Sequence, residues 1–474
     1  MTTYLDTDFS MLPELAERVS RWCADFQRDL PERPVACLND PRPSEAALPE
    51  SGGGATAALA DFEREVAPFL SGSAGPRYLG FVTGGVTPAA MLADWIVAAT
   101  DQNVAVPGDS ISAAIEYQVI DWLRQLLDLP EVFTGVLTSG ATAANVLGAV
   151  CGRQFAGLQQ GCDIARDGMS HARIEVFSAT PHASSLKALG LAGLGRDNVI
   201  RVPCRPDSEA MDVEALRDLL HRSTAPGKIV IASAGTVTGT DFDDLTTISA
   251  LCAAHRAWLH VDGAFGLFSR LSETRRAWTN GVELADSITC DGHKWLNVPY
   301  DCGIFFTRHP DILQQACSVA APYLDIGGKL PSPMDRGIEN SRRFRALPLW
   351  LSLKAYGRAG FAALVDNNCD QAKALATWIE RSPDYELLVP CRLNVVVFRP
   401  KTDDAGVRTR LGQINQSGQV FMTPGVWAGR AAIRAAFSNW RTTLDDVETV
   451  CAVLAEGANG ANCAAAGAPG EQSA

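Results

Sequence analysis

Lys294 is the residue of this chain with the clearest capacity for covalent chemistry. It follows the apolar, β-branched run 287–290, which predicts a buried strand, and the strand ends in Gly292-His293-Lys294. A partly desolvated amine at such a place can form a Schiff base with an aldehyde cofactor. A lysine whose stem crosses apolar surface and whose charge reaches solvent fits the same position. This stretch alone leaves both interpretations open.

Asp262 ends a second apolar run, within His260-Val261-Asp262-Gly263-Ala264. A buried carboxylate without a partner is costly, so a cation is expected beside it. The nearest basic residues in the sequence are Arg256 and Arg270, and neither is adjacent. A protonated pyridine nitrogen is such a cation, and a carboxylate keeps that nitrogen charged. The alternative is an aspartate that caps the turn at Gly263.

Two further segments suit an anionic, planar ligand. In 135–145 a strand-like run enters a turn of small residues and opens a helix, where backbone N–H groups and the hydroxyls of Ser139 and Thr142 are available to a phosphate. His182 follows a strand predicted over 173–178, where an imidazole can stack on a planar ligand. An ordinary capped helix and a hydrogen-bonded structural histidine also explain these segments.

Together the four segments supply a phosphate cup, a stacking ring, a pyridinium partner and a Schiff-base lysine. That combination is far more specific than any of its parts, and it is typical of pyridoxal 5′-phosphate enzymes. The cofactor predicted from the residues is therefore pyridoxal 5′-phosphate.

The elements that must position these residues alternate along the chain. Short apolar runs at 173–178, 198–202, 228–233, 257–261, 287–290 and 303–307 alternate with helical patterns such as 211–220 and 245–255. This alternation predicts an α/β fold with a mostly parallel sheet covered by helices on both faces. In such sheets ligands bind at the carboxyl ends of the strands, where the four segments lie.

The regions on either side of this alternation differ in character, which predicts four parts. Residues 1–75 form a helical N-terminal segment, 76–345 the large cofactor-binding domain, and 346–457 a smaller α+β domain. Residues 458–474 are rich in Ala and Gly with little apolar bulk, so a disordered tail is expected there.

Composition excludes several classes of partner. The chain has 474 residues and a net charge of -13, which argues against nucleic acid and anionic membranes as partners. Its 13 cysteines show no CxxC pair, and its seven histidines no HExxH pair, so no metal site is expected. The N-terminus lacks the basic region of a signal peptide, and the apolar runs are short for a bilayer. A cytoplasmic protein with reduced thiols is predicted.

The sequence resembles the group II amino-acid decarboxylases, the family of aromatic-L-amino-acid, glutamate and histidine decarboxylases. The resemblance runs from about Arg77 to Gly360 and is carried by the motifs Pro181-His182-Ala183-Ser184, His260-Val261-Asp262-Gly263-Ala264, Asp291-Gly292-His293-Lys294-Trp295-Leu296 and Ser341-Arg342-Arg343-Phe344-Arg345. It implies the fold type I architecture of pyridoxal-phosphate enzymes and a homodimer in which the N-terminal segment packs on the other subunit.

The resemblance also implies roles for individual residues. Lys294 looks like the lysine that binds the cofactor, Asp262 like the partner of the ring nitrogen, and His182 like the stacking residue. Other positions match the family's cofactor-binding and substrate-pocket residues: Ala141 and Thr142 in the phosphate turn; Ser287, Asp291 and His293 near the phosphate; Thr236 and Ala264 near the ring; and Phe81, Val82 and Thr83 in the substrate pocket.

The expected reaction is decarboxylation of an L-amino acid to its amine. In the family a mobile loop carries a tyrosine that resembles a proton donor, but 325–337 contains no tyrosine. Family members without it can release an aldehyde by oxidative deamination, which is the alternative. A non-catalytic scaffold is a third hypothesis, and the complete set of site residues argues against it. Phe81 and Val82 favour an aromatic or aliphatic substrate, whereas Arg77 and Arg345 are candidate partners for an acidic side chain.

Overall fold

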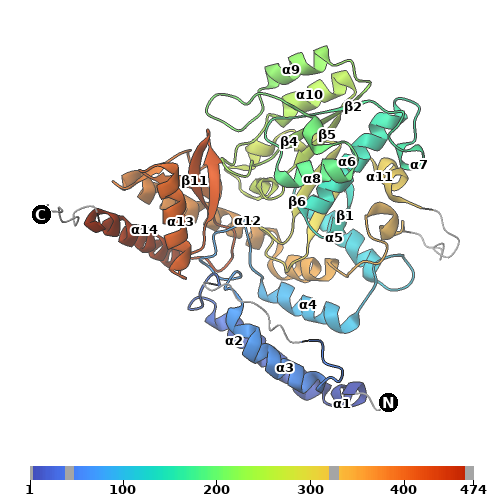
Figure 1. Cartoon of the computed structure of the whole chain (residues 1–474). Coiled ribbons are helices and arrows are strands. Elements are labelled where there is room, and N and C mark those ends of the chain that lie inside the picture. Colours follow the sequence, from blue (N-terminus) through green and yellow to red (C-terminus); the bar gives the residue numbers. More distant parts are fainter. Residues whose placement is uncertain (1–3, 38–46, 320–329, 465–474) are drawn as a thin grey trace, which may run out of the picture.

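The larger of two sheets positions most of the predicted site residues. A computed structural model describes residues 4–37, 47–319 and 330–464 (Figure 1). The sheet has the strand order β1-β7-β6-β5-β4-β2-β3. Its strands are β1 (Thr134–Thr138), β2 (Ile174–Ser178), β3 (Val199–Arg201), β4 (Gly227–Ser233), β5 (Trp258–Asp262), β6 (Ser287–Asp291) and β7 (Gly303–Thr307).

The predicted mostly parallel sheet is confirmed. Neighbouring strands from β6 to β3 run parallel, whereas β7 is antiparallel to both β6 and β1. The parallel strands β2, β4, β5 and β6 therefore end at one edge. Strand β7 runs the other way because the short segment between Asp291 and Gly303 returns the chain directly beside β6.

Helices cover both faces of this sheet. In β4, Ile229 and Ile231 belong to one apolar cluster, whereas Val230 and Ala232 belong to another, as strand alternation requires. The first cluster includes α6 (Ala141–Leu158), α8 (Ala183–Leu191) and α11 (Pro310–Cys317). The second includes α4 (Pro88–Thr100), α5 (Ser112–Leu126), α9 (Val213–Arg222), α10 (Leu245–His255) and α12 (Ala346–Arg381).

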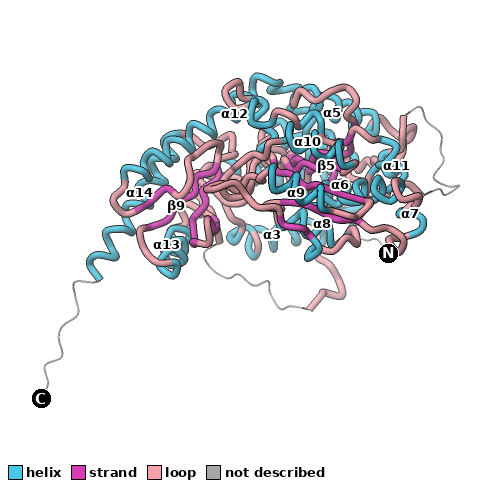
Figure 2. Tube along the Cα trace, turned by 90° about the horizontal axis from the view of Figure 1, so that it is seen from above, coloured by secondary structure: helices cyan, strands magenta, loops and turns pink. Residues whose placement is uncertain are grey.

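A second, antiparallel sheet forms the core of the smaller domain (Figure 2). Its order is β10-β11-β9-β8, and it has its own apolar cluster. The elements are β8 (Tyr385–Leu387), β9 (Val395–Pro400), β10 (Thr423–Trp427), β11 (Arg430–Ala436), α13 (Asp404–Gln416) and α14 (Leu444–Ala464). Helix α12 enters this domain and has a kink at Gly357, whose φ of 57° lies in the left-handed region. The domain boundaries at 75, 345 and 457 stay a prediction, because the apolar cluster of the large domain also includes Val395, Val397, Ala432 and Ala436 of the smaller sheet.

The C-terminal end departs from the predicted tail at 458–474. Helix α14 continues to Ala464, because the alanines there favour a helix even without apolar bulk. The remaining residues of the predicted tail, 465–474, lie outside the described part of the chain.

The N-terminal helices lie outside both sheet domains in Figure 1. They are α1 (Tyr4–Ser10), α2 (Leu12–Asp29) and α3 (Gly54–Glu65). An ion pair of Arg18 with Glu63 at 2.7 Å and an edge contact of Trp22 with Phe62 join α2 to α3. Short 3-10 helices occur at Ala67–Phe69, Arg196–Asn198, Gly266–Leu271, Arg276–Thr279, Val282–Leu284 and Pro333–Arg336.

Candidate active site

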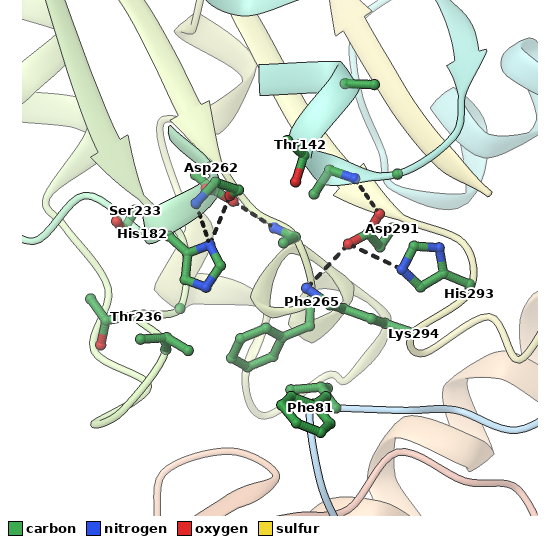
Figure 3. A pocket seen from close by; sticks show the side chains of 18 of the residues that line it. Phe81, Thr142, His182, Ser233, Thr236, Asp262, Phe265, Asp291, His293 and Lys294 are labelled. Atoms are coloured by element: carbon green, nitrogen blue, oxygen red, sulfur yellow. Dashed lines mark hydrogen bonds and ion pairs between the residues drawn. The ribbon is translucent and has the colours of Figure 1, made fainter. Parts of the chain in front are cut away.

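A cavity of about 480 Å³ lies at the carboxyl ends of the parallel strands (Figure 3). The turn that opens α6, the ends of β4, β5 and β6, and strand β11 of the smaller domain all contribute to it. Most predicted site residues meet here. The cavity is lined by Phe81, Val82, Ser139, Gly140, Ala141, Thr142, Ala143, Thr180, His182, Ser184, Ser233, Gly235, Thr236, Val237, Asp262, Ala264, Phe265, Asp291, His293, Lys294, Tyr300 and Arg434.

Lys294 extends into this cavity from the turn after β6 (Figure 3). Its Nζ lies 3.1 Å from Oδ2 of Asp291 and 5.8 Å from the centre of the Phe265 ring. The side chain is 18% exposed, and the contact with Asp291 holds its amine at the cavity wall. The structure therefore favours the interpretation in which the amine is available to a ligand in the cavity.

Asp262 lies on the opposite wall, at the end of β5. Its Oδ2 accepts hydrogen bonds from Asn145 Nδ2 at 3.1 Å and Ser185 Oγ at 3.0 Å, and its Oδ1 accepts one from the Ala264 amide at 3.2 Å. Within the described ranges no lysine or arginine forms an ion pair with this carboxylate. Its position at the cavity wall leaves room for a cation on the cavity side.

His182 caps the N-terminus of α8 and also lines the cavity. Its Nδ1 accepts a hydrogen bond from the Ser184 amide at 3.2 Å and lies 2.7 Å from Ser184 Oγ. His182 is exposed in the single chain, and partial desolvation by the side chains around it lowers its pKa. The hydrogen bonds confirm the structural interpretation of His182, and its stacking on a planar ligand stays a prediction.

The N-terminus of α6 lies at the cavity wall, where the phosphate cup is predicted. Gly140 begins the helix with a φ of 157° and no side-chain cap, so the first amides of the helix remain available at the cavity wall. The Ala141 amide is the exception, because it donates to Oδ1 of Asp291 at 2.6 Å. His293 lies close by, with its Nε2 3.6 Å from Asp291 Oδ2, and burial lowers the pKa of His293.

This set of groups fits pyridoxal 5′-phosphate. The free amides of the α6 N-terminus after Ala141 suit its phosphate, a carboxylate without a basic partner suits its ring nitrogen, and a partly buried lysine suits its aldehyde. Thr236 and Ala264 line the same cavity, as the resemblance implied.

Two predicted site residues lie elsewhere. Ser287 is at the opposite end of β6 from Asp291, fully buried, and bonds to Trp258 and His260. Thr83 does not line the cavity, because it is buried beneath the wall, where its carbonyl accepts a hydrogen bond from Ser438 Oγ at 3.0 Å. Both residues were assigned to the site by their match along the sequence. Such a match does not show how deeply a residue is buried or which end of its strand faces the cavity.

Arg77 and Arg345, the candidate partners for an acidic substrate, are also excluded from the cavity. Arg77 pairs with Asp446 at 2.9 Å and Arg345 with Asp301 at 2.9 Å. Neither lines the cavity.

Arg434 is a cavity residue that the sequence prediction missed. It is 6% exposed, and its Nη1 donates to Thr423 Oγ1 at 3.3 Å. Its Nε and Nη2 are buried without a hydrogen-bond partner in the described chain. Burial lowers the pKa of Arg434 to about 10, so the guanidinium is charged at neutral pH. The signal in the sequence is a single arginine inside the apolar strand 430–436.

Comparisons with known proteins agree with this geometry. The family described as "Pyridoxal-dependent decarboxylase conserved domain" matches residues 39–401. The aromatic-L-amino-acid decarboxylase of Bacillus atrophaeus is 29% identical over 84% of this chain and 85% of its own length. The L-2,4-diaminobutyrate decarboxylase of Rhizobium meliloti is 30% identical over 86% of this chain and 83% of its own length.

Solved structures share the fold. Oryza sativa TDC with PLP and tryptamine has a TM-score of 0.88 at 22% identity, covering 95% of this chain and 98% of its own. Rhodiola rosea 4-hydroxyphenylacetaldehyde synthase has a TM-score of 0.84 at 20% identity, covering 96% and 99%. With the family match over most of the sequence, the chain belongs to the pyridoxal-dependent decarboxylases: it is a pyridoxal-phosphate-dependent carboxy-lyase that removes carbon dioxide from an amino acid.

Proposed function

We propose that the cavity holds the cofactor with Lys294 at its aldehyde, Asp262 at its ring nitrogen and His182 against its ring face. Ala141, Thr142, Asp291 and His293 would surround the phosphate, with Thr236 and Ala264 near the ring. The observation that carries this proposal is Asp262, a carboxylate at the cavity wall that accepts three hydrogen bonds but has no basic partner among the described residues. When bound, the cofactor supplies an electron-withdrawing ring that accepts the electron pair left as carbon dioxide departs.

Each of these side chains has a defined task. Asp262 holds a positive charge on the ring nitrogen, because an anion without another partner stabilises the protonated form. Asp291 orients the Lys294 amine through their 3.1 Å contact. Partial desolvation lowers the pKa of His182, so its neutral ring adds a flat surface without adding a charge.

Arg434 is the proposed partner of the substrate carboxylate. Two of its nitrogens have no partner, and burial without partners is costly for a guanidinium, so an anion entering the cavity gains charge-assisted hydrogen bonds there. Lys294 already pairs with Asp291, so the cavity offers one uncommitted arginine for one carboxylate. With one arginine available for one carboxylate, the cavity favours a substrate whose only acidic group is its α-carboxylate.

The remaining walls favour an apolar side chain on the substrate. Phe81, Val82, Val237, Phe265 and Tyr300 line the cavity. Burial of an apolar side chain against such walls contributes about 25 cal/mol per Å². We therefore propose an aromatic or aliphatic L-amino acid as substrate and its amine as product.

The decisive experiment is a substrate panel. Purified holoenzyme is incubated with each proteinogenic amino acid, and carbon dioxide, amine and hydrogen peroxide are quantified. Aromatic or aliphatic amino acids should give carbon dioxide and amine in equal amounts. Preferential turnover of glutamate or aspartate would contradict the assignment of Arg434. Peroxide in place of amine would support the aldehyde-forming alternative, which the lack of a tyrosine in 325–337 motivates.

We further propose a homodimer. Phe81 and Tyr300 at the cavity are each 62% exposed in the single chain, and Leu5, Phe9 and Leu12 of the N-terminal helices are 73%, 78% and 54% exposed. Large apolar side chains with such exposure favour a surface that a partner covers. Light scattering after size-exclusion chromatography should give twice the chain mass of 50.6 kDa.

The proposed compartment is the cytoplasm. Cys151, Cys252, Cys290, Cys302 and Cys369 are buried free thiols, a state that a reducing compartment maintains. Among the described helices, none has the length and apolar character needed to cross a bilayer.

A further inference from the structure

Behind Asp262, four buried side chains outside the cavity form one continuous series of hydrogen bonds. Trp258 Nε1 donates to Ser287 Oγ at 3.0 Å, and Ser287 Oγ lies 2.8 Å from His260 Nδ1. His260 Nε2 lies 2.9 Å from Asn145 Oδ1, and Asn145 Nδ2 donates to Asp262 Oδ2 at 3.1 Å. None of these four residues is more than 2% exposed, and none lines the cavity.

The chemistry of the two ends gives this series a single direction. An indole N–H only donates and a carboxylate only accepts, so the series must run from Trp258 to Asp262. Asn145 Nδ2 donates to Asp262, so its Oδ1 must accept from His260 Nε2, and Nδ1 of the neutral ring is left to accept from the Ser287 hydroxyl. The ring proton is then on Nε2 and donates to Asn145 Oδ1, which turns the Asn145 amide N–H toward Asp262. Reversing any one step would place two donors or two acceptors against each other.

Burial keeps the central imidazole in the required state. It lowers the pKa of His260 to about 4, so at neutral pH the ring is uncharged and carries one proton. A protonated ring would have two N–H donors, and Nδ1 could no longer accept from Ser287. The neutral form is the one that completes the series.

The sequence provides the space for this arrangement. Trp258, His260 and Asp262 alternate along β5 and so point to the same face of the sheet, where α6 packs. On α6, a Cβ at Gly148 would lie 2.3 Å from His260 Cε1, so glycine is needed for the close approach. Asn145 is one helical turn earlier on the same side of α6 and bridges the two side chains of β5.

We propose that this series fixes the orientation and the anionic state of the Asp262 carboxylate. Asn145, His260 and Ser287 are then positioning residues, which act on the cofactor ring through Asp262 and do not touch it. The inference rests on the proposed placement of Asp262 at the ring nitrogen. It also gives Ser287 a task different from the predicted contact with the phosphate.

The test measures the protonation of the ring nitrogen in the resting holoenzyme. Nitrogen-15 NMR of enzyme loaded with ring-labelled cofactor reports the protonated fraction, and a parallel titration gives the cofactor dissociation constant. Ser287→Ala removes the donor to His260 Nδ1, so the ring is no longer held as the Nε2–H form. We expect a smaller protonated fraction and cofactor binding weaker by about fivefold, the worth of one buried hydrogen bond.

Matched variants separate this effect from a general loss of packing. Ser287→Thr retains the hydroxyl and should restore both values. Ser178→Ala removes a buried hydroxyl of β2 that donates to the Ile231 carbonyl at 2.7 Å and lies outside the series, and it should change neither. Asn145→Ala breaks the series beside Asp262 and should lower the protonated fraction and weaken cofactor binding in the same way as Ser287→Ala. It therefore tests the proposal even if the Ser287→Ala protein folds poorly.

Wild-type values for Ser287→Ala and Asn145→Ala, or an equal change for Ser178→Ala, would overturn the proposal. Asp262→Asn distinguishes this failure from failure of the cofactor placement. If Asp262→Asn leaves the ring nitrogen protonated, the placement of Asp262 is wrong. If Asp262→Asn removes the proton while the other variants retain it, only the inference about the series is wrong.

Discussion

Asp291 and Lys294 are paired across the turn that follows β6, with Oδ2 3.1 Å from Nζ. The other oxygen of Asp291 accepts the Ala141 amide at 2.6 Å, so one carboxylate links the lysine to the N-terminus of α6. The amine proposed to bind the aldehyde and the helix proposed to bind the phosphate are thus joined through one side chain. Their spacing is set by the protein before a ligand binds.

The first prediction concerns the covalent attachment of the cofactor. Lys294→Ala should abolish the visible absorbance of the lysine-bound cofactor, because no other lysine lines the described cavity. Lys294→Arg is the matched variant, since it retains a charge for Asp291 but cannot condense with an aldehyde. It should lose the same band. A band that persists in both purified variants would refute the assignment of Lys294.

The second prediction concerns Arg434 and the substrate carboxylate. Arg434→Gln should raise KM by about 10- to 100-fold without lowering kcat, because the lost charge-assisted hydrogen bond is stronger to the substrate carboxylate than to the transition state, in which the carboxylate loses its charge. Arg430→Gln is the control, since Arg430 is on the same strand but is exposed and pairs with Glu386. Steady-state kinetics on the best substrate of the panel gives both constants. An unchanged KM in Arg434→Gln would show that the carboxylate binds elsewhere.

The third prediction concerns acid stability. Burial holds the pKa of His260 at about 4, below its usual value of about 6.5 in an unfolded chain. The folded state therefore resists protonation, and its stability is fully present above pH 6.5 and declines as the pH falls from 6.5 to 4. Urea unfolding of the cofactor-free enzyme at several pH values should show this decline, and His260→Gln should make it shallower.

Asp243 acts in the opposite direction over the same range. Burial raises the pKa of Asp243 to about 6, so its contribution favours folding at low pH and is lost as the pH rises from about 4 to 6. In Asp243→Asn, the loss of stability on acidification should therefore be steeper than in the wild type. A pH profile equal to the wild-type profile in both variants would contradict these two assignments.

The sequence predicts the site residues that directly follow strands. Lys294, Asp262 and His182 each follow an apolar run, and parallel strands bring their carboxyl ends to one edge, so the cluster could be predicted from local pattern. Ser287 lies at the end of β6 away from the cavity, and Thr83 is buried outside the cavity lining. A match along the sequence does not say which end of a strand faces the cavity or how deeply a residue is buried. Arg434 reaches the cavity only because the smaller domain packs there, a tertiary contact with no local signal beyond a charge in an apolar strand.

The fourth prediction concerns the buried pair of Arg342 and Glu116. Arg342 Nη2 donates to Glu116 Oε1 at 2.7 Å and Nη1 to Oε2 at 3.1 Å, and the side chains are 0% and 2% exposed. The Leu137 amide also donates to Glu116, so the pair anchors β1 just before the phosphate turn. Glu116→Gln leaves the guanidinium buried without its anion and should lower the free energy of unfolding by about 3–5 kcal/mol.

A double variant tests the origin of that loss. Arg342→Met combined with Glu116→Leu removes both charges, so it should be less destabilised than either Arg342→Met or Glu116→Leu alone. The free energies come from urea unfolding of the cofactor-free enzyme. Equal, additive losses would mean that the two side chains contribute through packing and not through their charges. A non-additive result would establish that Arg342, in the motif Ser341–Arg345, stabilises the strand that leads into the phosphate cup.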